Sequence, residues 1–135
     1  MPSFFDTNAL IYFVSGDQQM AGRIFDLLHK GGWISVQVLN EAARVLRNKL
    51  KYDWPTIHTI LTDLRALLEV ASVDLDVHHL GLEIAERHKI GIFDAMIVAS
   101  ALRCGCDTLY SEDMHHGLVI DGRLTVSNPF RNIAT

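Results

Sequence analysis

The fold is indicated most clearly by the stretch FDAMIVASAL, which occupies residues 93–102. Its apolar residues lie on every face of a helix, and a helix of this kind is buried inside a domain. Gly91 before the stretch and Gly105 after it favour breaks in helical structure. The stretch is also far shorter than the roughly 20 residues of a membrane-spanning helix. We therefore expect the central buried helix of a globular domain.

Around this helix, short apolar segments alternate with longer segments of helical periodicity. The predicted strands are residues 4–5, 33–34, 70–73 and 108–110. The predicted helices are residues 19–29, a helix capped by Ser35, a helix opened by Trp54-Pro55, and residues 76–88. An Asp121-Gly122 turn joins two further apolar segments. This alternation predicts an α/β fold: one domain over residues 1–135, with a mainly parallel sheet and helices on both faces.

Composition narrows the class of protein. The chain has 135 residues, of which 49% are apolar and 21% charged, so a disordered chain is excluded. Two cysteines are too few for a disulfide scaffold. The N-terminus lacks the basic and apolar regions of a signal peptide, so we expect a cytoplasmic protein with no membrane association. A net charge of −4 argues against a general polyanion-coating protein but allows a local basic surface.

Four acidic residues differ from ordinary surface acids: Asp6, Glu41, Asp94 and Asp113. Asp6 and Asp113 follow predicted strands, where open α/β sheets bind ligands. Asp94 begins the buried helix, and Glu41 borders the apolar stripe of another. Singly, each has an ordinary interpretation as a helix cap, a loop acid or a solvated glutamate.

Together at one edge of the sheet, four carboxylates would repel one another unless a divalent cation bridged them. Hard oxygen ligands select Mg²⁺ or Mn²⁺. Without the cation, like-charge repulsion is expected to raise the pKa of some of these carboxyl groups.

The residues around these acids resemble the motifs of PIN domains, in particular bacterial VapC-type toxins. The resembling segments are Phe5-Asp6-Thr7-Asn8, Asp94-Ala95-Met96-Ile97-Val98-Ala99, Leu109-Tyr110-Ser111-Glu112-Asp113-Met114 and Asn128-Pro129-Phe130. The resemblance implies an endoribonuclease that hydrolyses RNA phosphodiester bonds with a metal-activated water, leaving 5′-phosphate and 3′-hydroxyl ends. It also implies the toxin of a type II toxin–antitoxin pair, a small VapB-type antitoxin as partner, and a homodimer.

The same resemblance implies roles for individual residues. Asp6, Glu41, Asp94 and Asp113 would be catalytic and would hold Mg²⁺ or Mn²⁺. Asn8 and Ser111 would be polar supports of the site. Glu112 adjoins Asp113 and is the alternative for the fourth acid.

Four basic residues and no acidic one lie between residues 42 and 52: Arg44, Arg47, Lys49 and Lys51. They begin one helical turn after Glu41, so we predict that they bind RNA phosphates beside the carboxylates. The alternative is an ordinary solvated helix face. For the whole protein, the alternative function is a catalytically silent PIN-like module that binds RNA or a protein.

Overall fold

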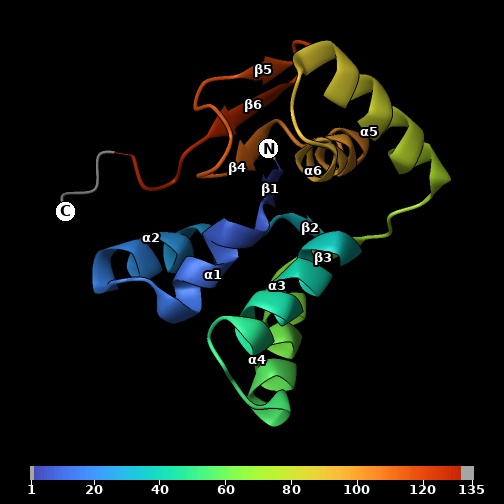
Figure 1. Cartoon of the computed structure of the whole chain (residues 1–135). Helices are drawn as coiled ribbons and strands as arrows, with labels where there is room; N and C mark the ends of the chain where they lie inside the picture. The colour runs from blue at the N-terminus through green and yellow to red at the C-terminus, as the bar shows by residue number, and fades with distance from the viewer. Residues whose placement is uncertain (1, 132–135) are drawn as a thin grey trace.

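Six strands form a single sheet in a computed structural model of the chain, which describes residues 2–131 (Figure 1). The strand order is β3-β2-β1-β4-β6-β5. The strands are β1 (Ser3–Phe5), β2 (Trp33–Ser35), β3 (Glu69–Ala71), β4 (Thr108–Tyr110), β5 (Val119–Ile120) and β6 (Leu124–Ser127). Strands β3, β2, β1, β4 and β6 pair in parallel, and β5 pairs antiparallel with β6. The predicted α/β fold with a mainly parallel sheet is confirmed.

The helices lie on both sides of this sheet. They are α1 (Thr7–Ser15), α2 (Gln18–Leu28), α3 (Val36–Asn48), α4 (Trp54–Leu67), α5 (Leu75–His88) and α6 (Ile92–Arg103). Figure 1 shows α1 and α2 on one side of the sheet and α5 and α6 on the other. Helices α3 and α4 form a hairpin that extends away from the sheet, with the connecting loop at its far end. Within residues 2–131, no helix has the length and apolarity needed to cross a bilayer.

Helix α6 is the buried helix that the sequence predicts. All residues from 95 to 102 are buried, and the helix packs along α5. Gly81 of α5 allows this close approach, because a Cβ atom there would lie 2.6 Å from the sulfur of Met96. The first turn of α6, which carries Asp94, is therefore held in place because the rest of the helix is buried in the core.

Two further predictions concern the ends of elements. The Asp121-Gly122 turn is confirmed: both residues have positive φ, 53° and 66°, as a tight hairpin between β5 and β6 requires. The predicted strand over residues 70–73 is wrong at its end, since β3 is Glu69–Ala71. Its partner β2 ends at Ser35, which pairs with Ala71, so the chain beyond has no neighbouring strand to bond.

Candidate active site

The sheet reverses its strand order between β1 and β4. From β1 the chain proceeds to β2 and β3 on one side, and from β4 it continues on the other. Such a switch point opens a crevice at the carboxyl ends of the two strands, where α/β proteins bind ligands. Asp6 directly follows β1, and residues 111–114 directly follow β4. The backbone N–H of Asp6 donates to the carbonyl of Tyr110 at 3.0 Å, which joins the two strand ends.

Asp6 is the most buried of the four acids, with 5% of its surface exposed. One carboxylate oxygen accepts from the backbone N–H of Thr7 at 2.7 Å, so Asp6 does cap α1. The other accepts from the Ser111 hydroxyl at 2.8 Å. Burial raises the pKa of Asp6 to about 6, with further contributions from the charges of Asp94 and Asp113, while the two hydrogen bonds oppose this rise. Asp6 therefore caps α1 and also lies within reach of the other acids of the candidate site.

The segment after β4 presents two neighbouring acids to two residues of α1. The amide of Asn8 donates to the carboxylate of Asp113, and the hydroxyl of Tyr12 donates to Glu112 at 2.8 Å. This bond to Glu112 is the main cause of the raised pKa of the Tyr12 phenol. Asn8 and Tyr12 lie one helical turn apart on α1. Each therefore binds one of the two neighbouring carboxylates, Asn8 that of Asp113 and Tyr12 that of Glu112.

Glu41 reaches the same region from the middle of α3. Its carboxylate accepts from the hydroxyl of Thr7 at 2.7 Å and from the amide of Gln37 at 3.0 Å. The same Gln37 nitrogen donates to the carbonyl of Phe93 at 3.1 Å, in the first turn of α6. Gln37 therefore links the helix that carries Glu41 to the helix that carries Asp94.

Asp94 lies half-buried in the first turn of α6, within electrostatic reach of Asp6, Glu41 and Asp113. Burial is the largest cause of its raised pKa, followed by the negative charges of Asp113 and Glu41. The expected rise in pKa is thus confirmed for Asp94 and Asp6. Its expected main cause is corrected, because loss of solvation outweighs like-charge repulsion at both residues.

The structure therefore brings Asp6, Glu41, Asp94 and Asp113 to one region, from four separate elements. Sequence reasoning missed Thr7 and Gln37 as their polar partners, and Tyr12 as the partner of the neighbouring Glu112. Gln37 precedes Glu41 by one helical turn, and this spacing was the one available signal for it. The hydroxyl contacts of Thr7 and Tyr12 join residues 34 and 100 positions apart, which no local pattern indicates.

The donor chemistry of this group fits a hard divalent cation, because all four side chains offer carboxylate oxygens. Among residues 2–131, no three or more His, Cys, Asp or Glu side chains form a ready-made metal-binding group. Protein donors hold three of the four carboxylates: Ser111 and Thr7 bind Asp6, Thr7 and Gln37 bind Glu41, and Asn8 binds Asp113.

The four predicted RNA-binding residues do not form one cluster. Arg44 lines a groove of about 880 Å³ together with Glu41 and Phe93, so it lies near Glu41, although none of the other three acids lines this groove. Arg47 is near the end of α3, and Lys49 and Lys51 follow in the loop to α4. The structure thus places one predicted cation at the candidate site and three at the far end of the hairpin.

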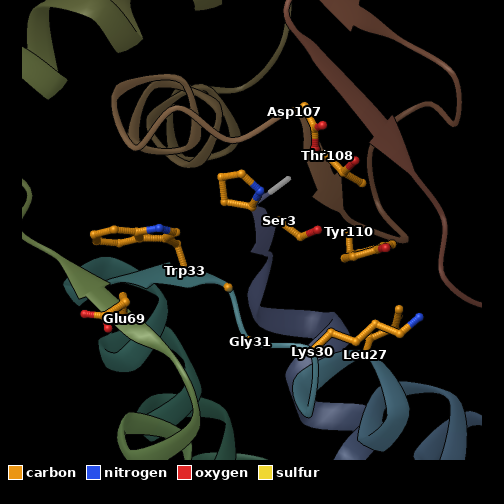
Figure 2. A pocket seen from close by; sticks show the side chains of 11 residues that line it. Ser3, Leu27, Lys30, Gly31, Trp33, Glu69, Asp107, Thr108 and Tyr110 are labelled. Carbon is orange, nitrogen blue, oxygen red and sulfur yellow. Dashed lines mark hydrogen bonds between the residues drawn. The ribbon is translucent and has the colours of Figure 1, made fainter.

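A second pocket, of about 590 Å³, lies at the opposite edge of the sheet (Figure 2). Its lining includes Ser3, Trp33, Glu69 and Thr108, which are the first residues of β1, β2, β3 and β4. None of the four acids lines it. The pocket is therefore separate from the candidate active site.

Known proteins share this fold. VapC20 of Mycobacterium tuberculosis, a sarcin–ricin-loop-cleaving toxin, is 21% identical with a TM-score of 0.66, covering 82% of this chain and 89% of its own. A toxin–antitoxin complex from Klebsiella pneumoniae gives 20% identity and a TM-score of 0.70, over 94% and 97% of the two chains. VapBC2 from Rickettsia felis, bound to a DNA fragment from its promoter, gives 22% identity and a TM-score of 0.69, over 95% of this chain and 98% of its own.

Comparison with curated protein sequences finds no match to this chain. The model of the PIN domain family, however, matches residues 3–117. That segment contains all six helices, four of the five parallel strands and all four acids. The chain therefore belongs to the PIN-domain family.

Proposed function

We propose that this protein is a Mg²⁺- or Mn²⁺-dependent endoribonuclease and the toxin of a type II toxin–antitoxin pair. The observation that carries the proposal is the convergence of Asp6, Glu41, Asp94 and Asp113 at the switch point of the sheet. Two of these carboxyl groups have raised pKa values. A protein that only binds RNA gains nothing from burying carboxylates that repel one another and the phosphates.

In this proposal, Asp6, Glu41, Asp94 and Asp113 hold the cation. When bound, the cation supplies positive charge that activates a water and stabilises the charge developing at phosphorus. Thr7 orients Glu41, Ser111 orients Asp6, and Asn8 orients Asp113 through the hydrogen bonds described above. Arg44 lies in the groove beside Glu41, where its guanidinium is suited to bind a phosphate of the substrate.

The proposed partners are RNA, a small VapB-type antitoxin and a second copy of the chain, all in the cytoplasm. The shared fold of the Klebsiella pneumoniae and Rickettsia felis toxin–antitoxin complexes supports an antitoxin partner. The homodimer rests on the family resemblance.

The test is cleavage of total cellular RNA by the antitoxin-free protein, with Mg²⁺ or Mn²⁺ and with chelator, followed by sequencing of the new 5′ ends. Asp94→Asn should abolish the cuts. Asp26→Asn is the matched control, because Asp26 is an exposed acid on α2. Cuts that persist in Asp94→Asn or in chelator would contradict the proposal. A folded protein that binds Mn²⁺ and RNA but makes no cuts would favour the silent binding module.

A further inference from the structure

We infer that the far end of the α3–α4 hairpin is a stacking platform for single-stranded RNA, with Trp54 as the surface on which a base stacks. This inference rests on the proposed nuclease function and names where the substrate is held away from the cleavage site. We call Arg47, Lys49, Lys51 and Trp54 the hairpin platform.

Trp54 is the centre of the hairpin platform. It is the first residue of α4 and is 52% exposed, an unusual position for the largest apolar side chain. The guanidinium of Arg47 lies over its ring at 4.9 Å from the centroid. Arg47 also donates to the carbonyl of Tyr52 at 3.1 Å, which fixes the guanidinium in this position. Arg47 therefore holds the indole from one side, while about half of the residue stays exposed to solvent.

The charge around Trp54 is positive. Arg47, Lys49 and Lys51 are all exposed. The neighbouring acid, Asp53, caps α4 by accepting from the backbone N–H of Thr56 at 2.9 Å. Between residues 47 and 54 there are thus three cations and one acid, in a protein whose net charge is −4. This local excess favours a polyanion over an acidic protein surface.

An exposed aromatic ring among cations is the arrangement that binds single-stranded nucleic acid. The ring stacks on a base of any type, and the cations bind the flanking phosphates. Arg47 lies about 9 Å along α3 from Glu41, at 1.5 Å per residue, and the exposed Arg44 lies between them. At about 100° per residue, Arg44 and Arg47 lie about 60° and about 120° around α3 from Glu41, so an RNA strand that winds around this side of α3 would contact both the platform and Glu41.

The protein offers a direct test, because Trp33 and Trp54 are its two tryptophans. Trp33 is half-buried and lines the pocket at the opposite edge of the sheet (Figure 2). In Trp33→Phe, the emission of Trp54 should be quenched saturably by a 12-nucleotide oligouridylate, in EDTA so that the RNA stays intact. In the matched variant Trp54→Phe, the emission of Trp33 should not change.

Affinity gives a second readout. By fluorescence anisotropy of the labelled oligouridylate, Trp54→Ala should bind about 5- to 100-fold more weakly, and Trp33→Phe within about twofold of wild type. The double substitution Lys49→Gln and Lys51→Gln should reduce the slope of log K against log salt by about 1.4. Circular dichroism would verify that each variant is folded.

Two outcomes would overturn the inference while leaving the nuclease intact. One is unchanged RNA affinity and no quenching of Trp54 in a protein that cleaves RNA. The other is a Trp54→Ala variant that binds RNA normally but sediments as a monomer where wild type is a dimer, which would assign this surface to a second copy of the chain. Failure of wild type to bind or cleave any RNA would instead overturn the proposed function.

Discussion

Asp6 shows, at the scale of one residue, that a feature suited to function opposes stability. A rise in its pKa from 3.8 to about 6 corresponds to about 3 kcal/mol against the charged form at neutral pH. Asp6→Asn keeps an oxygen for the N–H of Thr7 and places an amide beside Ser111. We expect this variant to be inactive but about 1–2 kcal/mol more stable than wild type in EDTA at pH 7.5, measured by urea unfolding.

The pH dependence follows from the same residue. Because the folded state binds the proton of Asp6 more tightly than the unfolded state, its contribution to stability falls as pH rises from about 4 to about 6. Asp6→Asn should lack this part of the slope. An Asp6→Asn variant that is less stable than wild type at pH 7.5 would show that the charged carboxylate of Asp6 does not destabilise the folded state.

The neighbours Glu112 and Asp113 permit a matched comparison at the residue scale. Asp113→Asn should weaken Mn²⁺ binding by more than about tenfold, since it removes a proposed ligand charge. Glu112→Gln should bind Mn²⁺ within about twofold of wild type, because the amide oxygen of the glutamine can still accept from Tyr12. Titration calorimetry with Mn²⁺ measures both. An equal loss in the two variants would make Glu112 a ligand as well.

At the scale of an element, α6 contains one polar group that its burial does not satisfy. The hydroxyl of Ser100 is buried and, within the described part of the chain, has no hydrogen-bond partner. Ser100→Ala removes this group and improves helix propensity, so the free energy of unfolding should rise by about 1 kcal/mol. Ser15→Ala, at an exposed hydroxyl, is the control and should change little. A less stable Ser100→Ala variant would indicate a partner that the hydroxyl binds in solution.

The elements also show what a sequence alone can predict. Helix α6 and the Asp121-Gly122 hairpin were predictable because burial on all faces and a two-residue turn each leave a local pattern. Helix α1 was not predicted: its apolar residues run consecutively through residues 9–14 without a single stripe. The end of β3 is set by where β2 stops, which is information from another segment.

The candidate site also contains residues that the sequence predicts and residues that it does not. The positions of Asp6 and Asp113 followed from the rule that ligand-binding residues come after strands. Their polar partners did not follow, because the contacts of Thr7 with Glu41 and of Tyr12 with Glu112 exist only once distant segments are packed together. The roles of the four acids in catalysis stay predictions.

At the scale of the whole molecule, the four acids connect segments that are distant in sequence: the end of β1, the middle of α3, the start of α6 and the segment after β4. A cation bound to all four would therefore stabilise the fold as a unit, because it binds the native state and not the unfolded chain. At a concentration 100 times its dissociation constant, this stabilisation is about 2.7 kcal/mol. For a chain of this length, such a change corresponds to a rise in melting temperature of several degrees.

We therefore expect 10 mM Mg²⁺ or Mn²⁺ to raise the melting temperature of wild type and of Asp26→Asn equally, by differential scanning fluorimetry. Asp94→Asn should lose most of this shift, since the charge of Asp94 interacts with those of both Glu41 and Asp113. The metal-free Asp94→Asn protein should itself melt no lower than metal-free wild type, because it lacks a carboxylate that burial and its neighbours disfavour. Equal shifts in Asp94→Asn and wild type would mean that the cation binds elsewhere in the protein. The four carboxylates would then repel one another with no bound cation to offset the repulsion.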